Sequence, residues 1–537
     1  MKKIDLLCAL AISLGSSSPV LGQAKLAPVA LPAAINEASI RAAAVASFPE
    51  YLALLALPND SIVSAQDIQV NANQLEKLFQ QRGFTTQQFA NQGKPLVLAD
   101  YVSNSVNPGN PANPPKKTIL FYLHFDGQPV IPSQWAQASP WLPVVKKKDA
   151  NGKWQIVGAD ELLRPDFDPE LRVFARAAAD DKGPIMMFLA ALDLMRAQGI
   201  TPAINIKVML DSEEEVNSPG IVALVKQKKD FFKADALVIH DMAAHASGRP
   251  TAIFGNRGVQ TVSLTVYGPK APLHSGHYGN FIANPAFSLA RLLASMKDER
   301  GRVLIPGYYA TTKLNKEDLR ALDAVADDEA AMKKRVGVAA TEQVANNYQR
   351  ALQYPSLNIR GMAAASVGNS AANIIPKEAI AEIDIRTTQE ADARYLTDLL
   401  QKHIVRQGFH VIDHAPDDAE RQRYPKLLQM QTGLPASAAR QSINAPVRQW
   451  VERAHQSAYA DLTASAGKQA NYQPMLIRAS GATVPTHEIV SPLGLPFVIV
   501  PTVNVDNNQH TYDENLRMGN YLSGMRIMLG LLNTSYP

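Results

Sequence analysis

Four apolar segments of this sequence lead directly into residues that can bind a metal ion or transfer a proton. Each segment is typical of a strand buried on both faces of a parallel sheet. Ligands of such sheets bind beyond the carboxyl ends of the strands, so we expect the residues that follow the segments to meet at one edge. Those residues are His124 after 119–123, Asp211 and the run 212–215 after 203–210, Asp241 after 235–240, and His510 after 495–505.

These residue types favour a metal site over the structural alternative, in which polar side chains only cap strand ends. Asp180 and Asp181 add two carboxylates at the start of a predicted helix. Histidine and carboxylate ligands suit zinc, with manganese or cobalt as alternatives. Two histidines and three carboxylates are too many for one open catalytic zinc, but they fit two ions that share a carboxylate. Two such ions can hold a hydroxide between them and polarise a carbonyl, which predicts a two-metal hydrolase.

The elements that must position these residues alternate between strand and helix. The predicted strands are 95–102, 118–124, 203–210, 235–240 and 495–505, and the predicted helices are much of 36–92, then 180–199 and 218–232. This alternation predicts an α/β catalytic domain with a mostly parallel central sheet flanked by helices.

The pattern changes near Gly258. Residues 259–268 alternate apolar and polar, as in a half-exposed strand, and the later elements fit a smaller sheet with helices on one face. We expect an α+β lid domain inserted at 260–415, between catalytic parts at 25–259 and 416–537. Its predicted elements are the helix 283–298, the strand 378–386 and the helix 391–408, with a polar, helix-favouring stretch at 315–352; residues 423–442 give no clear signal.

The first 24 residues are typical of a signal peptide. Lysines precede a short apolar stretch, and small residues follow, with cleavage after Gly22 or Ala24; an uncleaved anchor is the alternative. Cys8, the only cysteine, lies in this segment, so the mature chain would have no disulfide. The sequence predicts an exported protein, periplasmic or secreted, without a membrane span.

The charges are mild and evenly spread. A net charge of +4 over 537 residues comes without a basic block, which argues against binding to nucleic acid. A hydrophobic content of 46% is enough for a large core and more than one domain.

Five segments resemble, in the same order, the metal-site motifs of the M20 metallopeptidases. They are "LHFDGQPV", "ARAAADDKGP", "DSEEEVNSPG", "VIHDM" and "QHTYDENLRM", and the similarity spans about 100–530. This family includes carnosinase-like dipeptidases, glutamate carboxypeptidases and aminoacylases. The resemblance implies a co-catalytic zinc enzyme that cleaves an amide bond of a dipeptide or short peptide as an exopeptidase, through a metal-bridging hydroxide and a glutamate base.

The resemblance also implies a role for each residue. Asp126 would orient the ring of His124 from behind, and Glu214 would be the general base. The implied ligands are His124 and Asp241 for one ion, Glu215 and His510 for the other, and Asp180 as the bridge between them.

Four local features leave alternatives or make further predictions. The run of glutamates also permits Glu213 and Glu214 as the active pair. His240 competes with Asp241 as a ligand, although a residue just before a strand end is expected to pack inside. The resemblance implies a cis peptide between Asp180 and Asp181. The related motifs often have glycines before this aspartate pair; here Ala175, Ala177 and Ala178 replace them, so we expect a backbone that avoids positive φ.

The inserted domain carries further motifs that resemble substrate-contacting segments of the family. His274 in "PLHSGHYGN" would stabilise the oxyanion, and in dimeric members this histidine comes from the partner's lid; a polar hairpin turn is the alternative. The resemblance thus implies a homodimer through the lid. Asn373 and Arg386 would face the substrate, with Arg386 as a clamp for a free carboxylate. Gly481 and Thr483, with Arg478 nearby, would line the pocket.

Other functions remain open at this point. The nearest alternative is an N-acyl amino acid deacylase on the same scaffold. A non-catalytic periplasmic peptide-binding protein and a structural dimer are alternatives from other classes.

Overall fold

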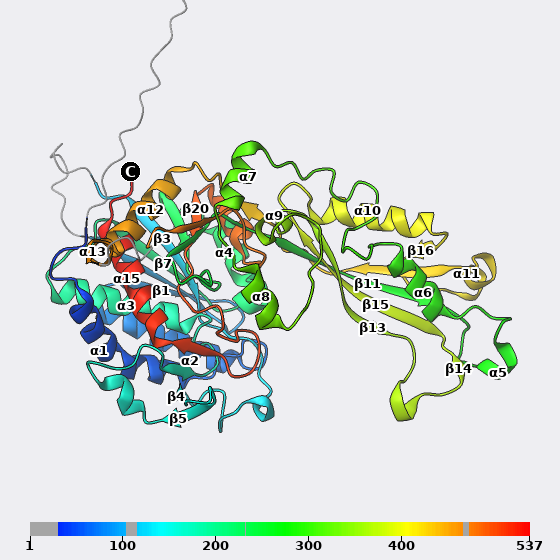
Figure 1. The fold of residues 1–537 in the computed structure, drawn as a ribbon, viewed down its shortest axis with the longest axis horizontal. Helices are drawn as coiled ribbons and strands as arrows, with labels where there is room; N and C mark the ends of the chain where they lie inside the picture. Colours follow the sequence, from blue (N-terminus) through cyan, green and yellow to red (C-terminus); the bar gives the residue numbers. More distant parts are fainter. Residues whose placement is uncertain (1–29, 104–114, 231, 466–471) are drawn as a thin grey trace, which may run out of the picture.

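The computed structural model describes residues 30–103, 115–230, 232–465 and 472–537. Figure 1 shows a large helix-covered body and a smaller, elongated body that are joined side by side. The predicted leader 1–24, with Cys8, lies outside the described residues.

The larger body is built on an eight-stranded sheet with the order β1-β2-β7-β3-β8-β20-β9-β19. The four central strands, β7, β3, β8 and β20, are mutually parallel, whereas β1 and β2 run antiparallel at one edge. The bounds are β1 Thr85–Phe89, β2 Leu96–Tyr101, β3 Thr118–His124, β7 Asn205–Asp211, β8 Ala236–Ile239, β9 Thr251–Ile253, β19 Met475–Ile477 and β20 Phe497–Ile499. The predicted mostly parallel α/β sheet is confirmed.

Helices cover both faces of this sheet because its central strands are apolar on both sides. Phe121 and Leu123 of β3 face one helical layer, and Leu120 and Tyr122 face the other. The first layer contains α1 (Glu37–Leu55), α2 (Ala65–Gln81), α3 (Lys182–Ala197), α12 (Pro446–Ala458) and α15 (Met518–Asn533). The second contains α4 (Pro219–Gln227) and α14 (Thr486–Leu493). Helix α13 (Ala460–Ser465) follows α12.

A second sheet of the large body, with the order β21-β6-β4-β5, has no counterpart in the sequence predictions. It joins distant segments, because β21, close to the C-terminus, pairs with β6. The strands are β4 Val144–Lys148, β5 Trp154–Val157, β6 Arg172–Phe174 and β21 Asn515–Arg517.

The smaller body is the predicted lid, a five-stranded sheet with the order β13-β15-β11-β17-β16. Alternate residues of β11 and β15 are buried under the helices α6 and α10, and those between them are half-exposed. The strands are β11 Gly258–Tyr267, β13 Ser356–Ala363, β15 Glu378–Thr387, β16 His410–Ile412 and β17 Leu427–Thr432; the helices are α6 Pro285–Ala294, α10 Ala393–Arg406 and α11 Asp418–Arg423.

Strand β17 corrects the predicted end of the lid. It pairs with β11 from Val262 to Tyr267, so the lid sheet continues beyond residue 415. The sequence of 423–442 gives no strand signal because only the first two residues of β17 are buried, so the strand lacks an alternation of apolar and polar residues. Beyond the strand, β18 (Ala439–Arg440) pairs with β10 (Gly255–Asn256) where the two bodies meet.

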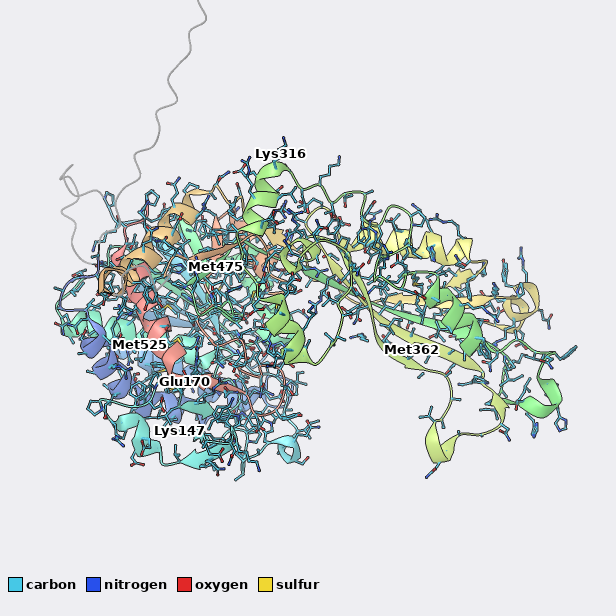
Figure 2. The ribbon with its side chains drawn as sticks, viewed as in Figure 1. Lys147, Glu170, Lys316, Met362, Met475 and Met525 are labelled. Atoms are coloured by element: carbon cyan, nitrogen blue, oxygen red, sulfur yellow. The ribbon has the colours of Figure 1, made fainter. Side chains whose placement is uncertain are left out.

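The polar stretch 315–352 forms an arm that returns from the lid to the catalytic body. It contains α7 (Lys316–Asp323), α8 (Glu329–Val336) and α9 (Tyr348–Ala351). Figure 2 shows Lys316 at the start of α7 above the catalytic body, which holds Met475, whereas Met362 lies out on the lid. Asp318 of α7 bonds to Arg478, which anchors the arm. Among the described residues, no helix is long and apolar enough to cross a membrane.

Candidate metal centre

Six of the predicted residues come together as two groups at the carboxyl edge of the main sheet. In each group, one ligand atom per residue lies within 4.8 Å of the others. β3, β7 and β8 deliver three segments to this edge, and the start of α3 and the loop after β20 deliver the rest. The groups are His124 with Glu214 and Asp241, and Asp180 with Glu215 and His510.

Asp180 joins the two groups. Its Oδ1 lies 2.9 Å from His124 Nε2, and its Oδ2 lies 3.2 Å from His510 Nε2. Burial alone would raise the pKa of Asp180, but the two histidines hold it well below its ordinary value. A carboxylate with one oxygen toward each group is the arrangement that a bridging ligand needs.

Asp126 lies behind His124, as the family resemblance implies. Its Oδ1 is 3.4 Å from His124 Nδ1 and accepts a hydrogen bond from the Glu214 backbone N–H at 3.0 Å. Its Oδ2 accepts from the Glu215 N–H at 3.2 Å and from the Ser61 hydroxyl at 3.1 Å. This buried carboxylate therefore fixes the turn of both glutamates and lies next to the ring of His124.

The three consecutive glutamates point to different partners, which distinguishes the two registers. Glu213 binds Lys94 Nζ and Asn91 Nδ2, each at 2.6 Å, so its carboxylate is engaged away from the site. Glu214 and Glu215 enter the two groups. The geometry therefore favours Glu214 with Glu215 over Glu213 with Glu214.

The donor set suits divalent cations because four carboxylates are crowded in a buried space. Burial and the charge of Asp180 raise the pKa of Glu215 to about 8 and that of Asp241 to about 6. Burial and the charge of Asp241 raise the pKa of Glu214 well above its ordinary value. Positive charge placed between these carboxylates would relieve their repulsion, and one histidine with two carboxylates per group is a ligand set that zinc accepts.

His240 is not part of either group. Its Nδ1 lies 2.8 Å from the Val500 carbonyl oxygen, and its ring stacks on Phe121. Burial lowers the pKa of His240 to about 4. The expected packing role is confirmed.

The loop before α3 corrects one expectation and confirms another. The Asp180–Asp181 peptide is cis, as predicted, but Ala177 adopts a left-handed backbone with φ +62° instead of avoiding positive φ. The reason is Glu514, a fully buried residue that the predictions missed. Its carboxylate accepts hydrogen bonds from the backbone N–H groups of Ala177, Ala179 and Asp180 at 2.9–3.0 Å. The only sequence signal for Glu514 is its position four residues after His510.

Glu514→Gln is expected to destabilise the folded protein by about 3–5 kcal/mol, because it leaves a buried cation unpaired. Arg176 Nη1 lies 2.8 Å from Glu514 Oε2, and both side chains are almost completely buried. The measurement is the thermal unfolding midpoint. Glu170→Gln is the matched control, since Glu170 pairs with Arg517 at the surface and its loss should matter little. Equal midpoints for the two variants would contradict this role.

Three predicted substrate residues meet where the lid joins the catalytic body. Arg386 on β15 donates from Nη1 to Thr483 Oγ1 at 2.9 Å. Gly481 lies in the same loop, and an added Cβ there would come within 3.3 Å of Leu352 on the arm. Arg478 is bound to Asp318 at 2.9 Å and to Gln353, so it serves the arm.

His274 and Asn373 lie elsewhere. β12 (Leu273–His274) pairs with β14 (Ile374–Ile375), and Asn373 accepts a backbone hydrogen bond from Ser275, the first residue of α5 (Ser275–Tyr278). Figure 1 shows α5 and β14 at the far tip of the lid, away from the main sheet. Within one chain, the two residues therefore do not reach the metal groups.

Comparisons with known proteins find peptidases that are similar to this chain. The family model described as "Peptidase family M20/M25/M40" matches residues 120–534. The Cys-Gly metallodipeptidase of Candida albicans is 25% identical over 82% of this chain and 81% of its own length. The Cys-Gly metallodipeptidase of Schizosaccharomyces pombe is 28% identical over 58% of this chain, which spans only 60% of that relative. The crystal structure of human carnosine dipeptidase 1 has the same fold, with a TM-score of 0.70, 20% identity, and coverage of 94% of this chain and 98% of that one.

The predicted export is corrected by these comparisons. The yeast Cys-Gly metallodipeptidases are cytosolic enzymes, which contradicts a periplasmic or secreted location inferred from the first residues alone. A short apolar stretch after lysines is a weak local signal, and the segment that carries it lies outside the described residues.

Proposed function

Since the chain belongs to peptidase family M20/M25/M40, we propose that this metallopeptidase is a two-zinc dipeptidase that releases the C-terminal residue of a dipeptide or short peptide. The observation that carries the proposal is the pair of histidine–carboxylate groups that meet at Asp180. The similarity to Cys-Gly metallodipeptidases and to a carnosine dipeptidase supports dipeptides as the substrate class.

In this proposal each residue group has one task. His124 and Asp241 hold one ion, Glu215 and His510 hold the other, and Asp180 bridges them. The bound ions would acidify the attacking water and polarise the scissile carbonyl. Asp126 would hold His124 in the tautomer that leaves Nε2 free to bind a metal.

Glu214 moves the proton. Its backbone is fixed by Asp126, and its carboxylate lies in the group of His124 and Asp241. Within the described part of the chain, no hydrogen-bond donor contacts this carboxylate. It is therefore free to take the proton from the attacking water and to return it to the leaving amine.

The substrate would be held by residues from two sides. Arg386, Thr483 and Gly481 lie at the junction of the two bodies, and Arg386 would bind the free carboxylate of the substrate. His274 and Asn373 would come from the lid tip of a second chain, so we propose a homodimer through the lid. This arrangement reconciles the role of His274 with its distance from the site within one chain.

A substrate panel on metal-loaded protein tests the proposed function. We expect Cys-Gly and β-Ala-His to be hydrolysed at least ~100-fold faster than N-acetyl amino acids, because a site built for a free dipeptide should reject analogues that leave its polar groups unpaired. Activity should disappear with a chelator and return with zinc. Faster turnover of N-acetyl amino acids would instead indicate a deacylase, and hydrolysis that survives the chelator would exclude the two-metal site.

A further inference from the structure

Gln128 is a half-buried glutamine in the segment 125–128, which follows β3 and also contains Asp126. Its Nε2 donates to Glu215 Oε2 at 2.6 Å. Asp126 in the same segment accepts the Glu215 backbone N–H at 3.2 Å. One short segment therefore holds Glu215 at both ends, at its backbone and at its carboxylate.

The segment is itself held in place by Asn59, which is completely buried. Asn59 Nδ2 donates to the Phe125 carbonyl oxygen at 2.8 Å, and the Asn59 carbonyl oxygen accepts from the Gly127 N–H at 2.9 Å. A Cβ added to Gly127 would lie 3.0 Å from Asn59 Nδ2, so the two segments are in close contact. These contacts restrict the position from which Gln128 reaches its partner.

A second glutamine, Gln509, has the same relation to the bridging Asp180. Its Nε2 donates to Asp180 Oδ2 at 3.3 Å, and its amide oxygen accepts from Asn507 Nδ2 at 3.0 Å. Asp180 Oδ2 and Glu215 Oε2 lie 3.2 and 3.3 Å from His510 Nε2. Each of the two glutamine amides thus contacts a carboxylate oxygen that faces His510.

These neutral amides differ from the cations that hold other buried carboxylates of this chain. Glu213, in the same run as Glu215, pairs with Lys94. Within the described ranges, neither Asp180 nor Glu215 forms an ion pair with a lysine or an arginine. A neutral amide fixes the direction of a carboxylate without adding positive charge, so the negative charge remains available to a divalent ion.

We propose that Gln128 and Gln509 are positioning residues for the second ion, the one that Glu215 and His510 would hold. Their amides orient the carboxylates of Glu215 and Asp180 toward that ion. This inference rests on the proposed function, because it requires the group of His510 to bind a divalent cation. Groups that orient the ligands of a metal contribute about 10–100-fold to its affinity in other proteins. Since Gln128 makes the shorter contact, its loss should have the larger effect.

The test measures zinc content instead of turnover. Full-length, zinc-loaded protein is equilibrated with chelator buffers of fixed free zinc concentration, and the bound zinc is measured by elemental analysis. Gln128→Met keeps the length of the side chain but removes the donor, so it is expected to weaken the binding of one ion by about 10–100-fold and that of the other by less than ~3-fold. Gln128→Lys should weaken the same ion further, because its ammonium competes with zinc for Glu215. Gln509→Met should give a smaller loss of the same ion.

Two backgrounds identify which ion depends on Gln128. In His510→Ala, which should lose the second ion, adding Gln128→Met should leave the affinity for the remaining ion unchanged. In Asp241→Asn, which weakens the first ion, Gln128→Met should still weaken the second ion to the full extent. A merely structural role of Gln128 would instead weaken the remaining ion in both backgrounds, which would overturn the inference.

Gln137→Met is the matched control, because Gln137 is also half-buried but its amide donates only to backbone carbonyl oxygens, those of Ser139, Leu142 and Phe174. Its zinc binding should equal that of the wild type. An unchanged zinc curve for Gln128→Met, or equal weakening of both ions, would overturn the inference. A wild-type chain that saturates with one zinc ion would overturn the two-zinc function itself, and a chain that binds two ions without hydrolysing dipeptides would overturn only the substrate class.

Discussion

Glu214→Gln is expected to lower kcat for Cys-Gly by about 10²–10⁴-fold while both zinc ions stay bound. The amide keeps the size and the backbone contacts of the glutamate but cannot accept a proton from water. The Glu214 N–H would still donate to Asp126 Oδ1, so His124 and Glu215 should keep their positions. The effect should therefore appear in kcat, with little change in KM for the dipeptide.

Glu213→Gln provides a control within the same three-glutamate run. Its carboxylate binds Lys94 and Asn91 instead of either metal group, so activity should change only slightly. Elemental analysis of both variants distinguishes a glutamate that binds metal from a glutamate that transfers a proton. Full activity of Glu214→Gln with two zinc ions per chain would exclude a general base at this position, and loss of zinc would make Glu214 a ligand.

The sequence was sufficient to predict where the metal groups would form. His124 and Asp241 each follow an apolar run, Glu214 and Glu215 follow the run that ends at Asp211, and parallel strands bring their carboxyl ends to one edge. Asp211 itself stays outside both groups and bonds to Tyr122. This inference needs only the periodicity of burial and the geometry of a parallel sheet. It also explains why the central strands were predicted well, since both of their faces are apolar.

The orientation of single side chains could not be predicted in the same way. In the run Glu213–Glu215, three identical residues have different partners because Lys94, Asn91 and Asp126 arrive from distant segments. The positive φ of Ala177 is another example, since it depends on Glu514, more than three hundred residues later. Local propensity favours glycine at such a position, but tertiary hydrogen bonds decide the conformation here.

The edges of the lid were hard to predict because their strands are only partly buried. β17 has two buried residues at its start and exposed residues at its end, so its pairing with β11 leaves no clear pattern in the sequence. The arm formed by α7 to α9 also lacks a clear apolar pattern, because its sequence is polar. It is held to the catalytic body largely by polar contacts, such as those of Asp318 with Arg478 and Asp327 with His245.

His274→Ala is expected to lower kcat by about 10²–10³-fold, as removal of an oxyanion-stabilising donor does in other hydrolases. The local structure of His274 is compatible with this proposed task. Its Nδ1 accepts a hydrogen bond from the Gly276 backbone N–H at 3.0 Å, so the proton of the neutral ring lies on Nε2, which is then a donor. The ring lies in an exposed position at the lid tip, where it can enter the site of another chain.

Mixing two inactive variants tests whether that other chain is the partner in a dimer. In a heterodimer of His274→Ala with Glu214→Gln, one site combines the intact Glu214 of the first chain with the intact His274 of the second. In a two-fold dimer, random exchange of equal amounts should therefore restore about a quarter of the wild-type activity. Exchange is confirmed by mass spectrometry of differently tagged chains. Recovery would require His274 to act across the interface. If the chains exchange and no activity returns, His274 must act within its own chain. Because His274 lies at the tip of an open lid, it could then reach its own site only if the lid closed.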